Sequence, residues 1–291
     1  MAARRAVRPP CHTAGVRRFV TIDLETVPDE ELVASVGHHG GASYAEQLKQ
    51  VVADRRARTG GRSDFLPLPY HRPVAACLLE AVEERGLVTL TDASCWTDQK
   101  EPEARFLERT WARLDGATVI TFHGGGFDLP VLALRSLKLQ VPAPGWFAEA
   151  RRTGSPAHVD VKELLSGAGS GGAAPLDLYA KLVGLPGKVD VAGEDVGALY
   201  AAGAHDRIAA YCMTDVVQTW LLWLRHRLVD GSLTPDGYEE SAEAARTRLP
   251  GLLASRLSAG EQAPLSGFLQ QCTSFFGAPR TTRRRALRAT T

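Results

Sequence analysis

The sequence lacks the cysteine patterns that stabilise small secreted domains or hold structural zinc. No C-x-x-C pair occurs, and the number of cysteines is odd. This argues against a disulfide framework and against a structural zinc site, and it fits a reducing cytoplasm. No apolar run approaches the ~20 residues that a membrane span needs, and the amino terminus has no continuous apolar stretch of the signal-peptide kind. We therefore expect a cytoplasmic protein that does not bind membranes. The five cysteines are Cys11, Cys77, Cys95, Cys212 and Cys272.

The chain also lacks an overall charge. Its 34 Lys and Arg residues against 33 Asp and Glu residues give a net charge of +1, so no global field attracts nucleic acid. Arginines gather at the two ends, where residues 1–18 and the residues after Glu261 contain no acid. We interpret residues 1–17 as a basic arm and residues 278–291 as a basic disordered tail. Such segments are typically solvated, and contact with phosphates is the alternative.

A nucleotide-binding loop of the common kinds is missing too. Gly124, Gly125 and Gly126 form the one glycine triplet, but their surroundings match neither G-x-x-x-x-G-K-[ST] nor G-x-G-x-x-G. At 291 residues and 44% hydrophobic, the chain can still bury a large core. We expect one main domain, with a helical extension over residues 233–277.

What the sequence does contain is a buried strand, residues 18–25, that ends in two carboxylates. Val20, Ile22 and Leu24 alternate with polar residues, so the two-residue period of a strand places Asp23 and Glu25 on the other face. Neighbouring acids repel each other, and a divalent cation is the usual compensation. An edge strand with solvated acids is the plainer alternative.

Strands come first along the chain, and strands alternating with helices follow. This order predicts an α/β fold with a mixed central sheet, antiparallel in its first strands and then parallel, flanked by helices. Strands are predicted at 73–83, 86–94, 117–122 and, briefly, within 157–165. Helices are predicted at 44–58 within an insertion over 29–64, and at 102–114, 127–137, 175–183, 206–228 and once or twice in 234–275. The intervening segments 65–73, 142–152, 166–174 and 184–193 are expected to be extended or loops.

A further acid, Asp128, follows the glycine triplet at the start of a predicted helix. Glycines allow a backbone or a ligand to approach closely. A helix N-cap is the equally good alternative reading of an aspartate at this position.

The long helix 206–228 carries Tyr211 and Asp215, which share a face one turn apart. Their neighbours are apolar, so this part of the helix is not a solvated surface. For an isolated Y-x-x-x-D, a satisfied buried pair is the commoner explanation.

Taken together, the strand-end D-x-E, the acid after a glycine turn and the helical Y-x-x-x-D resemble the DEDD superfamily of 3′–5′ exonucleases in its tyrosine-bearing branch. They are most similar to the predicted exonucleases related to the proofreading domain of family B DNA polymerases. Other matching segments are Leu66-Pro67 through His71, His158-Val159-Asp160, Gly184-Leu185-Pro186-Gly187-Lys188 and Asp195 to Tyr200. The resemblance covers residues 18–232 and implies an RNase H-like fold. One departure is His123, where that group usually has Asn.

The resemblance implies a metal-dependent 3′–5′ exonuclease that releases nucleoside 5′-monophosphates. Two Mg²⁺ or Mn²⁺ ions would be held by Asp23, Glu25, Asp128 and Asp215, because oxygen ligands suit these ions. Tyr211 would orient the attacking water, since its pKa of ~10 makes it a poor base at neutral pH. Nucleic acid 3′ ends are the expected partner, single-stranded DNA more than RNA, and a non-catalytic nucleic-acid-binding module is the other alternative. Expected substrate contacts are Leu24, Thr26, His123, Phe127 and Lys188.

Overall fold

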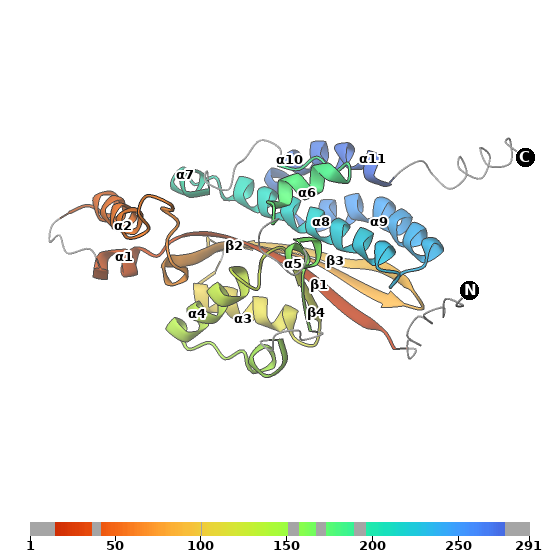
Figure 1. The fold of residues 1–291 in the computed structure, drawn as a ribbon, viewed down its shortest axis with the longest axis horizontal. Helices are drawn as coiled ribbons and strands as arrows, with labels where there is room; N and C mark the ends of the chain where they lie inside the picture. Colours follow the sequence, from red (N-terminus) through yellow and green to blue (C-terminus); the bar gives the residue numbers. More distant parts are fainter. Residues whose placement is uncertain are drawn as a thin grey trace, which may run out of the picture.

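A computed structural model describes residues 15–36, 42–99, 101–150, 157–166, 173–188 and 196–276. A five-stranded sheet of order β3-β2-β1-β4-β5 forms its centre (Figure 1). β1 pairs antiparallel with β2, and β2 antiparallel with β3, whereas β1, β4 and β5 run parallel. The mixed α/β sheet and the RNase H-like strand arrangement are therefore confirmed. The strands are β1 (Arg17–Pro28), β2 (His71–Glu84), β3 (Leu87–Thr97), β4 (Thr118–Thr121) and β5 (His158–Asp160).

Alternation along β1 divides the core into two layers. Val20, Ile22 and Leu24 pack with α3 (Glu103–Leu114) and α4 (Asp128–Leu139) on one side of the sheet. Phe19 belongs to the other layer, which is built mainly by the long helix α8 (His205–Val229). Since neighbouring side chains of a strand point to opposite faces, Asp23 and Glu25 share the α8 side with Phe19. The alternation of side chains along β1 thus places the two acids on the side of the sheet that α8 covers.

The remaining helices complete these two layers. α9 packs on β3 and α10 packs on α8, so the carboxyl-terminal helices share one core with the sheet. The boundary between a main domain that ends at residue 232 and a helical extension over residues 233–277 stays a prediction. Figure 1 shows α6, α8, α9, α10 and α11 above the sheet and α3 and α4 below it. The bounds are α5 (Val161–Ser166), α6 (Leu176–Leu182), α7 (Val196–Ala201), α9 (Pro235–Arg256), α10 (Ala259–Gln271) and α11 (Thr273–Phe276).

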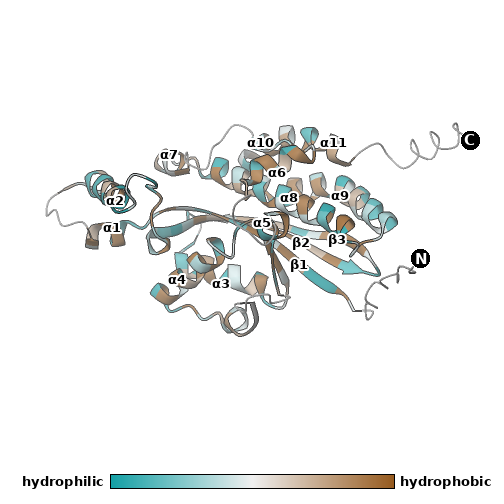
Figure 2. Cartoon of the chain, viewed as in Figure 1, coloured by the Kyte–Doolittle hydropathy of each residue, from teal (hydrophilic) through white to brown (hydrophobic). Residues whose placement is uncertain are grey.

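The insertion between β1 and β2 forms a small unit of its own. It contains α1 (Glu30–Val36), α2 (Tyr44–Arg58) and the 3₁₀ turn η1 (Leu68–Tyr70). A separate apolar cluster of Val33, Val51 and Leu66 holds these pieces together. Figure 1 shows α1 and α2 beyond the end of the sheet at which β1 ends, and Figure 2 shows α2 as largely hydrophilic.

Several local expectations need correction. Within 65–73, predicted to be extended, η1 is helical; within 142–152, predicted to be a loop, residues Trp146–Ala150 form the π-helical turn η2. Trp146, the first residue of this turn, packs beside Trp111, with the ring centroids 5.8 Å apart. The strand and turn predicted in 157–165 are a three-residue strand followed by helix α5. The predicted arm at 1–14 and tail at 278–291, most of the 166–174 loop and residues 189–193 lie outside the described residues.

The expectation against disulfides is also corrected, because Cys77 and Cys95 form one. The two residues are directly opposite each other in the β2–β3 ladder. A pairing of this kind depends on strand register, which the spacing of cysteines does not reveal. Among the described residues, no helix is both long enough and apolar enough to cross a bilayer.

Candidate active site

Asp23 and Glu25 lie near the carboxyl end of β1, on the side of the sheet that α8 covers. Both side chains are half-buried. One ligand atom from each, together with Sγ of Cys212 on α8, lie within 4.8 Å of one another. The Cys212 thiol donates a 3.2 Å hydrogen bond to the backbone carbonyl of Asp23. Strand β1 and helix α8 are thereby joined at the position of the D-x-E pair.

Asp128 begins α4 and is directed to the same strand end. Its Oδ1 accepts a 3.0 Å hydrogen bond from the backbone N–H of Leu24, the residue between the two β1 acids. The N-cap residue of α4 is Phe127, which makes no capping hydrogen bond with its side chain. Asp128 is only 4% exposed. The N-cap reading of Asp128 is therefore wrong, and the carboxylate joins β1 instead.

The glycine turn ahead of α4 has little spare room. His123 adopts a left-handed backbone conformation at φ 66°, and a Cβ added to Gly124 would lie 2.5 Å from the Thr121 side chain. Asp160, at the end of β5, fixes the turn by accepting hydrogen bonds from the backbone N–H groups of His123 (2.8 Å) and Gly125 (3.2 Å). Left-handed backbone is easier for Asn and His than for most residues, so His123 suits this turn.

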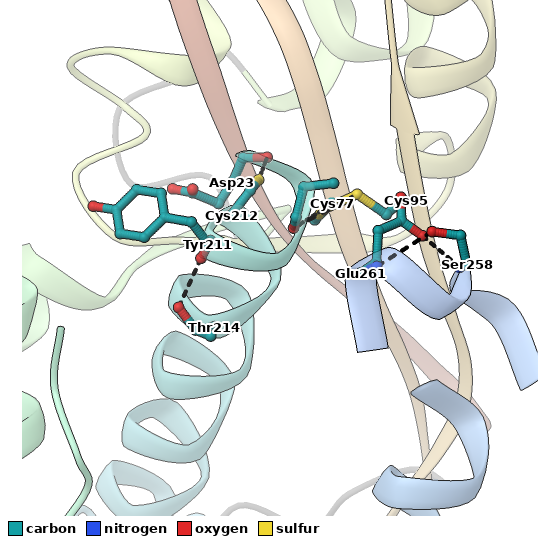
Figure 3. Close-up of a disulfide and its surroundings, with 9 residues drawn as sticks. Asp23, Cys77, Cys95, Tyr211, Cys212, Thr214, Ser258 and Glu261 are labelled. Atoms are coloured by element: carbon teal, nitrogen blue, oxygen red, sulfur yellow. Dashed lines mark hydrogen bonds between the residues drawn. A yellow bond between two sulfur atoms is a disulfide. The ribbon is translucent and has the colours of Figure 1, made fainter. Parts of the chain in front are cut away.

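Tyr211 and Asp215 come from α8, one turn apart, and both are buried. Figure 3 shows the Tyr211 ring and the Asp23 side chain on the same side of the helix, with Cys212 beside Asp23. The Gln218 side-chain amide lies 3.4 Å from Oδ1 of Asp215, and its carbonyl accepts a 2.8 Å hydrogen bond from Gly187. Asp215 is thus connected to the turn that carries Lys188.

Asp128 and Asp215 are not part of the 4.8 Å group, but their charges act on both acids of β1. Burial raises the pKa of Asp23 well above its ordinary range, and the charges of Asp128, Glu25 and Asp215 raise it further. Burial, then Asp215 and Asp128, likewise raise the pKa of Glu25. Burial raises the pKa of Asp128 to about 7 and that of Asp215 to about 6. We call Asp23, Glu25, Asp128 and Asp215 the acid cluster.

Lys188 and Tyr211 lie beside the acid cluster and interact with its charges. The Lys188 ammonium lies 5.2 Å from the centre of the Tyr211 ring, and its charge lowers the pKa values of Glu25 and Asp215. Burial, then the charges of Asp215, Glu25 and Asp23, raise the pKa of Tyr211 above its ordinary value. Tyr211 is therefore a neutral phenol at physiological pH, able both to donate and to accept a hydrogen bond.

The other residues expected to contact substrate lie around this cluster in different ways. The side chain of Leu24 is buried in the core, so only its backbone amide takes part in the site. Thr26 lies just beyond Glu25, and its Oγ1 is 2.9 Å from Nδ1 of His71. Phe127 is half-buried against His71, and His123 is exposed.

Cys212 is the neighbour of the acids that sequence reasoning missed. Its signal was available, since it follows Tyr211 directly on the same helix, but a lone cysteine there also suits a helix core. Burial, then the charges of Asp23, Glu25 and Asp215, raise the pKa of this thiol well above its ordinary range. Cys212 is therefore a thiol, not a thiolate, in the metal-free protein.

The donor set fits hard divalent cations. Carboxylates from β1, α4 and α8 contribute to the site, and Lys188 is the cation whose charge lowers the pKa values of Glu25 and Asp215. Oxygen-rich sites with this excess of negative charge suit Mg²⁺ or Mn²⁺.

Comparison with known proteins gives one family match and one solved structure of low similarity. A family model described as a predicted 3′–5′ exonuclease related to the exonuclease domain of PolB matches residues 63–272. No curated protein matches the chain. A solved family B DNA polymerase from the hyperthermophilic archaeon Pyrobaculum calidifontis is similar with a TM-score of 0.44 and 16% sequence identity. The match covers 86% of this chain and 29% of the polymerase, so the chain spans under a third of that protein's length.

Proposed function

The chain belongs to the family of predicted 3′–5′ exonucleases related to the exonuclease domain of PolB, and we propose that it removes nucleotides one at a time from the 3′ ends of nucleic acid. The preferred substrate is single-stranded DNA, and the products are nucleoside 5′-monophosphates. The observation that carries the proposal is the acid cluster itself, in which Asp128 accepts a hydrogen bond from Leu24 between the two β1 acids, and the charges of Asp128 and Asp215 act on both of them.

Exonuclease domains of this kind use divalent metals. We propose that Asp23, Glu25, Asp128 and Asp215 hold two Mg²⁺ or Mn²⁺ ions, directly or through water. When bound, such ions supply Lewis acidity and stabilise the negative charge that develops at the phosphate.

The chain's own groups bind and orient the reactants. Tyr211, kept neutral by burial and by the acids, holds the attacking water by a hydrogen bond from or to its hydroxyl. Water attacks the phosphorus of the terminal phosphodiester, and the bond to the 3′ oxygen of the preceding nucleotide breaks. The water loses a proton to solvent, and the departing 3′ oxygen takes up a proton to become a hydroxyl. Lys188, exposed beside Tyr211, is placed to contact a substrate phosphate. Its ammonium group adds positive charge where negative charge develops on the phosphate in the transition state.

Substrate contacts extend around the cluster. We propose that Thr26 and Phe127, which directly adjoin Glu25 and Asp128 in sequence, contact the terminal nucleotide. His123 contributes from the exposed glycine turn, and Leu24 contributes through the backbone amide that positions Asp128. Apolar and aromatic side chains hold single-strand ends by stacking.

A labelled-strand assay tests the proposal. Single-stranded DNA and RNA of matched sequence, labelled at either the 3′ or the 5′ end, are incubated with Mg²⁺ or Mn²⁺, with and without chelator. The expected result is mononucleotide release from 3′-labelled DNA and progressive shortening of 5′-labelled DNA, abolished by chelator and by Asp215→Ala. No shortening with any divalent metal would favour the non-catalytic binding module. Faster shortening of RNA would identify an exoribonuclease instead.

The cytoplasmic location also stays a prediction. It rested in part on the absence of a cysteine framework, and the Cys77–Cys95 disulfide removes that part of the argument.

A further inference from the structure

An exposed aromatic side chain that belongs to no motif described above contacts Phe127, the residue before Asp128 of the acid cluster. Phe65, in the segment that leads from α2 to η1, is 56% exposed although it is a large apolar residue. Its ring stacks on His71 with centroids 4.9 Å apart and an angle of 28° between the planes. It also packs against the ring of Phe127, with the two ring centroids 5.7 Å apart. With one face on His71 and most of its surface in solvent, the ring presents an open face.

The aromatic group is tied to the acid-bearing segments on two sides. His71 is fixed by Oγ1 of Thr26 at 2.9 Å and by the carbonyl oxygen of Leu66 at 3.1 Å. Thr26 follows Glu25, and Phe127 precedes Asp128, so both partners of Phe65 adjoin residues of the acid cluster.

Phe65 is held in place by the insertion rather than by the sheet. Its carbonyl oxygen accepts a 3.0 Å hydrogen bond from Arg55 in the last turn of α2, and its N–H donates to Oγ of Ser63 at 3.1 Å. Leu66, the next residue, is buried in the small core of the insertion. The backbone is thus fixed while the side chain remains exposed, which is the arrangement of a preformed binding surface.

The segment that leads to Phe65 carries more exposed cations than acids. Arg56 and Arg58 in the last turn of α2, and Arg62 three residues before Phe65, are exposed, as is the acid Asp64. Across the described part of the chain, no carboxylate lies within ion-pair distance of these three guanidinium groups. An aromatic face beside unpaired arginines is the combination that binds single-stranded nucleic acid, the ring to bases and the arginines to phosphates.

We propose that Phe65, supported by His71 and Phe127, stacks on an unpaired nucleobase at the 3′ end of the substrate and makes the enzyme prefer single strands. This inference rests on the proposed exonuclease function and adds a substrate-binding subsite contributed by the insertion between β1 and β2. A base in a duplex is already stacked and paired, so it reaches the ring only after unpairing.

The test compares four proteins on single-stranded DNA with Mg²⁺: wild type, Phe65→Ala, Phe65→Leu and Phe65→Trp. Loss of the ring should raise KM about 5- to 100-fold, the range that loss of one base-stacking contact gives, and change kcat much less. Phe65→Leu should behave like Phe65→Ala, because it keeps apolar bulk but not the aromatic face. Phe65→Trp should retain the wild-type KM or lower it.

Two further measurements separate stacking from a merely structural role. A strand whose 3′-terminal base is 2-aminopurine, bound with Ca²⁺ in place of Mg²⁺, should be quenched by wild type and Phe65→Trp but not by Phe65→Leu. On a strand with an abasic 3′-terminal nucleotide, Phe65→Ala should differ from wild type in KM less than about twofold, because the base that the ring would contact is already absent.

Phe147→Ala is the matched control. Phe147 is 42% exposed on η2, between Trp146 and Ala148, which line a hollow at the amino ends of β1 and β4, the opposite ends from the acids. The Phe147→Ala variant should have the wild-type KM and quench 2-aminopurine as wild type does. If Phe65→Leu equals wild type in KM and quenching while wild type cleaves DNA, the stacking subsite is wrong and the exonuclease proposal stands. If wild type shortens no strand, the exonuclease proposal itself falls.

Discussion

The backbone N–H of Leu24 donates a 3.0 Å hydrogen bond to the side chain of Asp128, across 104 positions of sequence. Leu24 lies between the two acids of β1, and Asp128 begins α4. The strand therefore orients the third carboxylate directly, and the side chain that could have capped its own helix is directed to the acid cluster instead. This bond converts two separate sequence motifs into one site.

Neutralising an acid of the cluster should stabilise the metal-free protein. In Asp23→Asn we expect no cleavage and an unfolding free energy at pH 8 higher by about 1–3 kcal/mol in chelator. The sign follows from linkage: the folded-state pKa of Asp23 is raised, so the folded protein binds more protons than the unfolded chain, and its stability falls as pH rises above the unfolded value of about 3.9. Denaturant unfolding at pH 8 and pH 4 measures the difference in unfolding free energy between Asp23→Asn and wild type. This difference should be smaller at pH 4.

Glu84→Gln is the control for this comparison. Glu84 is an exposed acid at the end of β2, and its removal should change the unfolding free energy by less than about 0.5 kcal/mol. A metal-free Asp23→Asn protein that is no more stable than wild type at pH 8 would mean that the carboxylates do not repel one another.

Tyr211→Phe should slow hydrolysis while leaving metal binding intact. The neutral phenol orients water and transfers no proton in our proposal, so we expect kcat to fall roughly 10- to 100-fold, less than the 10²–10⁴-fold typical of a lost acid or base. Mn²⁺ binding, followed by electron paramagnetic resonance, should match wild type. Tyr44→Phe, which alters a hydroxyl on α2, should behave as wild type. Activity within twofold of wild type in Tyr211→Phe would remove this residue from the mechanism.

Metal affinity should rise with pH. The pKa of Asp128 is raised to about 7 and that of Asp215 to about 6 in the metal-free protein, so below these values protons compete with the cation. We expect Mg²⁺ affinity to increase up to tenfold per pH unit for each displaced proton between pH 5.5 and 7, and to level off above pH 8. Calorimetry in two buffers of different ionisation enthalpy measures the protons released. A constant affinity over this range is the contrary result.

The left-handed backbone at His123 should discriminate between substitutions of similar size. His123→Asn should be as stable as wild type, because Asn accepts this conformation readily. In His123→Val, a β-branched side chain opposes it and should lower the unfolding free energy by about 1–2 kcal/mol. Thermal unfolding of the two variants provides the measurement. Equal stability of the Val and Asn proteins would show that the turn relaxes without cost.

The sequence indicated more of the site than of its surroundings. The two-residue alternation of β1 and the i, i+4 pair on α8 are local regularities, so the faces that carry Asp23, Glu25 and Tyr211 followed from covalent geometry alone. The Cys77–Cys95 disulfide could not be predicted from a local pattern of this kind. It depends on the register between β2 and β3, and one residue of slip would have separated the two sulfur atoms.

By itself the sequence determined the order of elements, the residue types of the acid cluster and the faces on which β1 and α8 present them, because periodicity depends only on neighbours along the chain. Only the tertiary structure decided that Asp128 bonds to Leu24 rather than capping α4, and that the insertion places Phe65 against His71 and Phe127. Both relationships join distant segments whose distance is fixed by the packing of the sheet, its helices and the small core of the insertion, and no local pattern records that packing.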